Sequence, residues 1–278
     1  MPELPEVETI VRGLQAQPLK GRVIQYVWTD CPAMVAPLTP KKFARCLQGR
    51  AIEGFARRAK YIIINLSGDW TLLGHLRMSG QLSVSAPDVP RDRHQHIIFG
   101  LDGGLELRYR DTRKFGRWLA TDQPEKVLER LGPEPLSRGF SVAWLRARLK
   151  RTARRLKPLL LDQTFLAGLG NIYTDEALWA ARLSPTRRAD SLTDAEAARL
   201  HQAIRRVLSQ GIRHGGTTLG EGLGNFKLLS GRQGGNQRWL QVFHRDGLPC
   251  RRCGATIQRL VVAQRGTHIC PVCQNGNH

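Results

Sequence analysis

Four of the six cysteines lie near the C-terminus and have the spacing of a metal site. They form two C-x2-C pairs separated by sixteen residues: Cys250, Cys253, Cys270 and Cys273. Two such pairs of thiolates can surround Zn2+ tetrahedrally. Four protein ligands leave no position for a catalytic water, so the sequence predicts one zinc ion with a structural role.

Disulfides are the main alternative for these cysteines, and they would require an oxidising compartment. The acidic N-terminus, with Glu3, Glu6 and Glu8, differs from a signal peptide and argues against export. A redox role would require a C-x-x-C motif beside a β-α-β unit, and the sequence shows no such unit. Zinc is therefore favoured.

The N-terminus could supply a nucleophile. Removal of Met1 would leave Pro2 with a free secondary amine, and an α-amino group with a pKa near ~8 is partly neutral at neutral pH. A neutral amine can attack carbon and form an iminium. Many proteins begin with Met-Pro, so this pair alone is weak evidence. Glu3 also has a simpler interpretation, as a first-turn carboxylate that favours the helix dipole.

Charge and composition restrict the class of protein. The 278 residues include 43 Lys and Arg against 23 Asp and Glu, a formal charge of +20, and this excess favours nucleic acid as the partner. Hydrophobic residues make up 41% of the chain, enough for a folded core. No apolar run approaches the ~20 residues of a membrane-spanning helix. We therefore expect a folded, cytoplasmic protein without membrane association.

Residues 3–16 have the spacing of an amphipathic helix, with apolar side chains recurring every three or four residues. Glu3 falls within the apolar stripe and Glu6 lies at its edge, so carboxylates there should face the protein or a cleft. Glu8 is expected to face solvent.

From residue 22 to 121 short β-type runs follow one another without intervening helices. Strands are expected at 23–28, 61–66, 71–76, 96–101, 105–109 and 117–121. Asp102-Gly103-Gly104 is a hairpin signal between two of them. This order predicts an antiparallel sandwich or barrel.

After Gly132-Pro133-Glu134-Pro135 the pattern becomes helical. Helices are expected at 142–156, 171–181 and 194–212, the last with a capping box of Thr193 and Glu196. The fold class is therefore α+β: an N-terminal antiparallel β-sandwich with an N-terminal helix, followed by a helical domain and a zinc module. The expected domains are residues 1–133, 134–240 with a Gly-rich loop over about 217–240, and 241–278.

Several short motifs, in this order and spacing over nearly the whole chain, resemble those of the bacterial formamidopyrimidine-DNA glycosylases in the Fpg/endonuclease VIII family. They are the opening MPELPEVET, Arg57-Arg58-Ala59-Lys60-Tyr61, Met78-Ser79-Gly80, His94-Gln95-His96, Asp111-Thr112-Arg113-Lys114-Phe115-Gly116, Leu161-Asp162-Gln163, Gly168-Leu169-Gly170-Asn171 and the cysteine module. The resemblance implies a β-sandwich, a helix–two-turns–helix unit and a β-hairpin zinc finger, with double-stranded DNA in the cleft between the domains.

The resemblance also implies catalytic roles. Pro2 would form a Schiff base with the damaged nucleotide, and Glu3 would donate a proton as the deoxyribose ring opens. Lys60 would lie at the phosphates near the lesion and take part in β-elimination; by itself it could be a solvated lysine at a strand end. Arg265 would contact flanking phosphates and assist δ-elimination; by itself it is one exposed charge among many.

Base flipping leaves a gap in the duplex that side chains must fill. Met78, Arg113 and Phe115 match the family residues that fill the gap, bind the orphaned cytosine and wedge apart the neighbouring pairs. Without the motif, Met78 and Phe115 would be assigned to a core. His94 and Asn171 match phosphate contacts, and either could instead be a local cap or turn residue.

Three departures from the family pattern stand out, and the smallest is Thr112, which replaces a usual proline. Arg77 replaces the usual glycine before Met-Ser-Gly. Over residues 219–239, the usual acidic residue and the following Gly-x-Phe/Tyr-x-Gln motif are not clearly present. The family uses this loop to close over extruded 8-oxoguanine, so the departure affects the expected base preference.

The combined interpretation is a monomeric, bifunctional DNA glycosylase/AP lyase of base excision repair, located at the nucleoid. It would excise 8-oxoguanine and formamidopyrimidines and then cut the strand by β,δ-elimination. One alternative is an endonuclease VIII-like glycosylase for oxidised pyrimidines, although that group typically has glycine where Leu4 stands. The other is a non-catalytic zinc protein that binds nucleic acid on the same scaffold.

Overall fold

The computed structural model describes residues 1–220 and 225–275. The chain divides into two compact units, and each is described by itself. The N-terminal unit comprises Met1–Glu129 and His214–Gln237; the helical unit comprises Arg130–Arg213 and Arg238–His278. The sequence assigned His214–Gln237 to the helical domain, but its contacts group it with the N-terminal unit. The three expected domain boundaries stay predictions.

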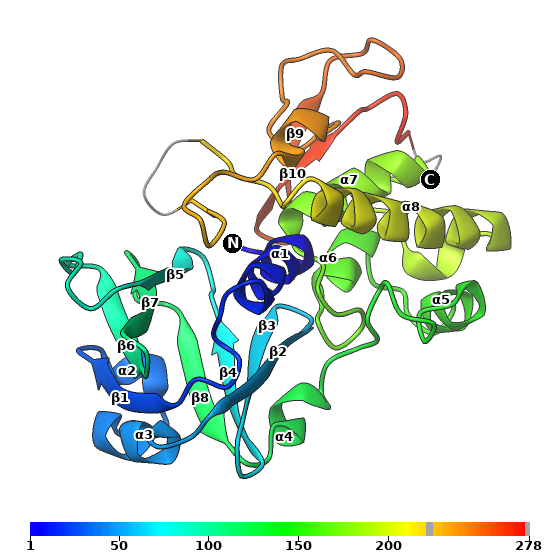
Figure 1. The fold of residues 1–278 in the computed structure, drawn as a ribbon. Helices are drawn as coiled ribbons and strands as arrows, with labels where there is room; N and C mark the ends of the chain where they lie inside the picture. The colour runs from blue at the N-terminus through cyan, green and yellow to red at the C-terminus, as the bar shows by residue number, and fades with distance from the viewer. Residues whose placement is uncertain (221–224, 276–278) are drawn as a thin grey trace. The chain divides into compact units, whose positions relative to one another are not determined.

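Two four-stranded antiparallel sheets form most of the N-terminal unit (Figure 1). The first sheet has the order β1-β6-β7-β5, with β1 Ile24–Thr29, β5 Gly80–Ser85, β6 Gln95–Leu101 and β7 Leu105–Asp111. The second has the order β2-β3-β4-β8, with β2 Ile52–Arg58, β3 Tyr61–Leu66, β4 Trp70–His75 and β8 Arg117–Thr121. Buried side chains from both sheets, such as Ile64 and Phe99, share one core, which confirms the predicted sandwich.

Helix α1, Leu4–Gln15, buries its apolar stripe in the same core. The helix was expected at 3–16, and its spacing of apolar residues is the reason it forms here. The sequence did not predict β2, β5 or the short helices α2 Pro32–Val35, α3 Pro40–Leu47 and α4 Glu125–Leu128. In β2 the arginines and Gly54 interrupt the apolar alternation that identifies a strand.

The helical unit contains α5 Val142–Leu149, α6 Leu156–Leu161, α7 Asn171–Ala181 and α8 Asp194–Arg213, with the 3-10 turn η1 Ala189–Ser191. A second 3-10 turn, η2, spans Asn236–Trp239. The single helix expected over 142–156 is wrong. Arg155 forms an antiparallel bridge with Arg188, and the Leu156 N–H donates to the Arg187 carbonyl at 2.9 Å, so the chain leaves the helical path before α6 begins.

The predicted capping box at α8 is confirmed. The Glu196 N–H donates to Thr193 Oγ1 at 3.2 Å, and the Thr193 N–H donates to Glu196 Oε2 at 2.9 Å. Strands β9 Gln258–Val262 and β10 Arg265–Ile269 form the C-terminal hairpin, which turns through Ala263 and Gln264, both with left-handed φ. No helix of the described ranges has the length and apolar character needed to cross a membrane.

Candidate active site and metal centre

The N-terminus of α1 brings the predicted catalytic carboxylate into the protein. Glu3 is the N-cap residue and forms a capping box with Glu6. Their side chains are buried, with Glu3 2% and Glu6 1% exposed, and Pro2 is buried beside them. The expectation that carboxylates on this stripe face the protein is confirmed.

Glu6 joins the N-terminus to a turn more than two hundred residues away in the sequence. Its Oε2 accepts the Glu3 N–H at 2.8 Å, and its Oε1 accepts the Thr217 N–H at 2.7 Å. Gly216 has φ +79°, and a Cβ there would lie 3.0 Å from Glu6 Cγ. Glycine is therefore needed where this turn approaches α1.

The terminal amine lies among charged groups of both signs. Burial lowers the pKa of the Met1 α-amino group from its ordinary value of 8.0, and the carboxylates of Glu3 and Glu6 oppose this shift. The cations of Lys60 and Arg113 act in the same direction as burial. A lowered pKa leaves more of the amine neutral at neutral pH, which is the form that attacks carbon.

Lys60 occupies the two-residue turn between β2 and β3, where Arg58 pairs with Tyr61. It is only 5% exposed, so the alternative of a solvated lysine at a strand end does not apply. Glu8, expected to face solvent, is instead partly buried and accepts a hydrogen bond from Arg57 Nε at 2.8 Å. The helical pattern could not reveal this ion pair, because its partner comes from another element.

Met78 and Phe115 are 44% and 46% exposed, so the alternative that they belong to the core is wrong. The Arg113 guanidinium lies 4.7 Å from the centre of the Phe115 ring. The three predicted duplex-wedging residues are thus on the surface of the unit, with Arg113 and Phe115 in contact.

Asp111 organises this surface, a role that the sequence did not reveal. It is fully buried, and its Oδ1 accepts from Ser79 Oγ and from the Arg113 N–H at 3.1 Å. Its Oδ2 accepts the Gly116 N–H at 2.8 Å and the Tyr109 hydroxyl at 3.2 Å. One carboxylate therefore joins the turn after Met78 to the loop that carries Arg113 and Phe115. Its place at the start of the Asp111–Gly116 motif was the available signal.

His75 supports the same turn from the end of β4. Burial, with the nearby cations of Arg77 and Lys60, lowers the pKa of His75 to about 3, so the ring is neutral at neutral pH. Its Nδ1 accepts the Arg77 N–H at 3.1 Å. Arg77 has φ +54°, a left-handed conformation that glycine adopts more readily. The backbone thus explains why a glycine is usual here.

His94 and His96 differ in their surroundings. His94 is half-buried; its N–H donates to Asp92 Oδ1 at 3.0 Å, and its Nε2 accepts from Arg93 Nε at 3.2 Å. His96 is buried, and its Nδ1 lies 2.8 Å from Asp30 Oδ1.

Asn171 and Arg265 are both positioned by the hairpin contacts of the helical unit. Asn171, the first residue of α7, donates from Nδ2 to the Gly266 carbonyl at 2.8 Å. Lys157 is fully buried and donates to the same carbonyl at 3.0 Å, to Thr267 Oγ1 at 2.8 Å and to Asp175 Oδ1 at 2.7 Å. Arg265 is exposed at the first position of β10, so this network holds the strand from which it extends.

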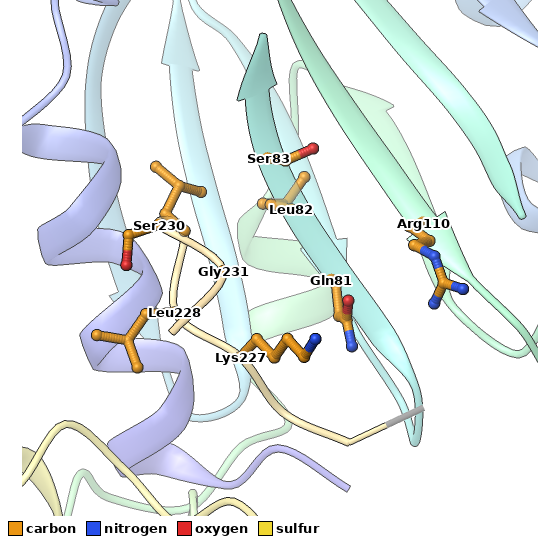
Figure 2. Close-up of a pocket in the computed structure, with 9 residues that line it drawn as sticks. Gln81, Leu82, Ser83, Arg110, Lys227, Leu228, Ser230 and Gly231 are labelled. Carbon is orange, nitrogen blue, oxygen red and sulfur yellow. The ribbon is translucent and has the colours of Figure 1, made fainter. Parts of the chain in front are cut away.

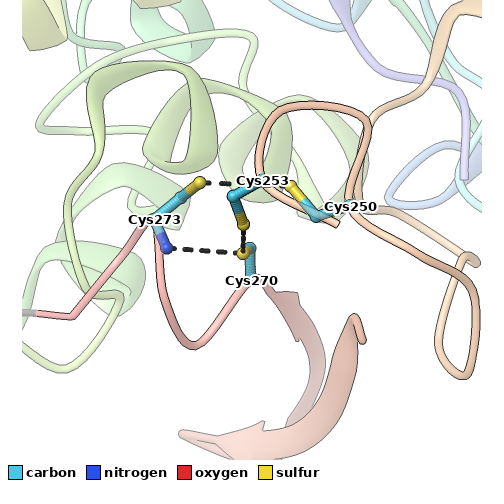
Figure 3. Close-up of side chains that lie close together, drawn as sticks. All are labelled: Cys250, Cys253, Cys270 and Cys273. Carbon is cyan, nitrogen blue, oxygen red and sulfur yellow. Dashed lines mark hydrogen bonds between the residues drawn. The ribbon is translucent and has the colours of Figure 1, made fainter. Parts of the chain in front are cut away.

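The four predicted zinc ligands gather at the base of the hairpin (Figure 3). All four Sγ atoms lie within 4.8 Å of one another; Cys253 and Cys270 are 3.4 Å apart, and Cys250 and Cys273 are 4.0 Å apart. Four sulfurs around Zn2+, each ~2.3 Å from the metal, would be separated by about 3.8 Å. The thiols therefore have the donor set and spacing for one structural zinc ion.

The N-terminal unit also contains a cavity of about 300 Å³ between β5 and residues 227–231 (Figure 2). Its lining includes Gln81 and Lys227, and Gln81 Nε2 donates to the Asn225 carbonyl at 2.6 Å. None of the individually predicted site residues lines it, but residues 227–231 belong to the Gly-rich loop expected over about 217–240.

The atypical loop is described only in part. Residues 221–224, which belong to the atypical stretch 219–239, lie outside the described ranges. On either side, Thr218 Oγ1 donates to the Phe226 carbonyl at 2.7 Å and accepts the Gly234 N–H at 2.9 Å.

Comparisons with known proteins agree along the whole chain. Residues 1–118 match the formamidopyrimidine-DNA glycosylase N-terminal domain, residues 131–221 the H2TH domain of these enzymes, and residues 247–276 a zinc finger found in FPG and IleRS. The chain is 50% identical to the formamidopyrimidine-DNA glycosylase of Herpetosiphon aurantiacus, covering 99% of this chain and 100% of the relative. It is 46% identical to that of a Roseiflexus species, with the same coverage.

Solved structures give the same result. An FPG mutant of Lactococcus lactis bound to DNA containing Fapy-dG matches with a TM-score of 0.91 and 38% identity, over 99% of this chain and 100% of that one. Lactococcus lactis Fpg bound to DNA with an abasic site matches with a TM-score of 0.90 and the same identity and coverage. The α+β fold, the helical region and the cysteine hairpin thus define a DNA-repair glycosylase. The chain belongs to the formamidopyrimidine-DNA glycosylase family of base excision repair.

Proposed function

We propose that the protein is a bifunctional DNA glycosylase/AP lyase that excises 8-oxoguanine and formamidopyrimidines from duplex DNA and acts as a monomer. The observation that carries the proposal is the position of the terminal amine. In the structure this amine belongs to Met1; the charged groups of Glu3, Glu6, Lys60 and Arg113 act on it, and burial lowers its pKa. The Pro2 nitrogen lies one residue further along the chain, in a residue that is buried next to Glu3. An amine nucleophile beside a buried carboxyl group and two cations suits attack on a sugar carbon next to anionic phosphates.

Removal of Met1 makes Pro2 the terminal residue. Its neutral nitrogen attacks C1′ of the extruded nucleotide, and the bond from C1′ to the base breaks. Glu3 donates a proton as the deoxyribose ring opens, which leaves an iminium between the Pro2 nitrogen and C1′. Loss of a proton from C2′ then breaks the 3′ C–O bond by β-elimination, and loss of a proton from C4′ breaks the 5′ C–O bond by δ-elimination, so that a one-nucleotide gap remains between two phosphate ends. Lys60 assists the first elimination and Arg265 the second, each at the adjacent phosphate.

Three exposed residues fill the duplex after the base leaves it. Met78 occupies the gap, Arg113 binds the orphaned cytosine and Phe115 separates the neighbouring pairs. Their exposure and the contact between Arg113 and Phe115 support this assignment. His94 and Asn171 bind phosphates of the damaged strand, and Asn171 does so at a helix N-terminus, where the dipole favours anions.

Zinc, held by Cys250, Cys253, Cys270 and Cys273, stabilises the fold of the hairpin that carries Arg265 and supplies no reactive ligand position. The buried contact of Lys157 with Gly266 and Thr267 fixes the other end of the same hairpin.

Borohydride trapping tests the function. The Met1-processed protein is mixed with duplexes that carry 8-oxoguanine opposite cytosine, an abasic site or an oxidised pyrimidine. We expect a covalent adduct with the 8-oxoguanine and abasic duplexes, and its loss when the terminal amine is blocked. Preference for the oxidised pyrimidine would favour an endonuclease VIII-like specificity. Salt-sensitive binding without any adduct would indicate a non-catalytic DNA-binding protein.

A further inference from the structure

The turn that carries Lys60 is held in a conformation that its own residues do not favour. Ala59, the other residue of the turn, has φ +54°. This left-handed region is costly for a residue with a Cβ and is ordinarily taken by glycine. Something outside the turn must therefore keep Ala59 in place.

Arg57 supplies that restraint. One guanidinium nitrogen, Nη1, donates to the Ala59 carbonyl at 3.0 Å. Another, Nε, donates to Glu8 Oε2 at 2.8 Å. Glu8 lies on α1, the helix that begins at Glu3, so Arg57 contacts the turn and the helix at the same time. The side chains of Arg57 and Glu8 are only 11% and 22% exposed, which limits screening of their attraction by solvent.

We propose that the Glu8–Arg57 ion pair positions Lys60 relative to the N-terminus of α1. The pair holds the turn against the helix and keeps Ala59 left-handed. Without it, Ala59 relaxes toward negative φ and the Lys60 ammonium moves away from the terminal amine. Arg57 and Glu8 are positioning residues; neither is assigned a contact with DNA or the reacting atoms. The inference rests on the proposed function of Lys60.

Glu8 also provides an internal control. Its second oxygen, Oε1, accepts from Arg12 Nε at 2.8 Å. Arg12 lies one turn further along the same helix, and its side chain is 61% exposed. The Arg12–Glu8 ion pair therefore lies within one helix and does not connect α1 to the turn. Its loss should not change the position of Lys60.

The test measures the rate of borohydride trapping on an abasic duplex under single-turnover conditions, together with affinity for a duplex with a non-reactive abasic analogue. Arg57→Ala should slow trapping by about 10- to 100-fold, the scale expected when a reacting group shifts by about 1 Å. Affinity should stay within about two-fold of wild type, because Arg57 only positions Lys60. Arg12→Ala should trap at the wild-type rate.

A second substitution separates positioning from general destabilisation. Ala59→Gly lets the turn adopt φ +54° without the Arg57 restraint, so the double variant Arg57→Ala, Ala59→Gly should recover most of the lost rate. In a Lys60→Ala background, Arg57→Ala should cause no further loss, because the two changes act through one group.

Three results would overturn the inference while the proposed function survives: wild-type trapping by Arg57→Ala, equal losses in Arg12→Ala and Arg57→Ala, or no recovery with glycine at position 59. Absence of trapping by the wild-type protein would overturn the proposed function and this inference with it.

Discussion

Replacement of Glu6 by glutamine should loosen both the N-terminus and the turn at Thr217. The carboxylate is buried and accepts two backbone N–H bonds, from Glu3 and Thr217. Hydrogen bonds to a charged group contribute about 1.5–3 kcal/mol each, whereas a neutral bond contributes about 1 kcal/mol. Glutamine keeps one acceptor but turns its NH2 group toward the other N–H donor. We expect a loss of about 2–5 kcal/mol in the free energy of unfolding, from a total of ~5–15 kcal/mol for a typical domain.

Urea denaturation measures the total effect, and amide hydrogen exchange locates it. The Thr217 and Glu3 amides of Glu6→Gln should exchange faster than those of wild type, because one of the two N–H groups loses its acceptor. Glu53→Gln is the matched control, because Glu53 is exposed on β2. The role of Glu6 in holding the turn at Thr217 would be refuted by two results together. These are an unfolding free energy of Glu6→Gln within about 0.5 kcal/mol of wild type and unchanged amide exchange at Thr217.

Three further predictions follow from buried groups and from the cysteine cluster. Asp111→Ala removes the acceptor of four hydrogen bonds. At about 1 kcal/mol for each bond, it should lower the free energy of unfolding in urea by about 4 kcal/mol. It should also weaken discrimination between damaged and undamaged duplexes, and intact discrimination would contradict the role of Asp111 in organising the surface. Burial lowers the pKa of His75 to about 3 in the folded protein. As the pH falls, the unfolded chain therefore binds a proton at His75 before the folded protein does. The free energy of unfolding should decline by up to about 1.4 kcal/mol per pH unit below pH ~6.5. His75→Gln should reduce that slope in denaturation series at several pH values. Cys250→Ser, or removal of zinc by a chelator, should unfold the C-terminal hairpin and weaken DNA binding; wild-type affinity in a protein verified as zinc-free by metal analysis would exclude the structural zinc.

Patterns of neighbouring residues were sufficient to predict the bounds of some helices and strands. Strands β3 and β8 and helix α7 have the predicted bounds, because their apolar periodicity and flanking turn residues are strong. The cysteine cluster was predicted for a similar reason, since each C-x2-C pair presents two thiols from one tight turn.

Predictions failed where a distant partner competes with the local pattern. The helix expected over 142–156 ends at Leu149, and Arg155 within the expected span instead pairs with the distant Arg188. Glu8 was expected in solvent because the helical projection contains no information about Arg57, 49 residues further along the chain. The role of Asp111 was missed because one of its four donors, Ser79, lies 32 residues earlier in the chain, and this contact joins the two surface segments.

The amino-acid sequence by itself determined which reactive and charged groups are available here: Pro2 directly after Met1, carboxylates on one face of a helix, an excess of basic residues and four cysteines with zinc spacing. The tertiary structure decided which of these groups meet. Glu6 bonds to Thr217 across 211 positions of the sequence, and Arg57 joins the turn that carries Lys60 to Glu8 on α1. Periodicity and spacing contain information only about residues that are neighbours along the chain. Hydrogen bonds between distant residues form when folding buries their segments against each other, because a buried polar group without a partner is costly.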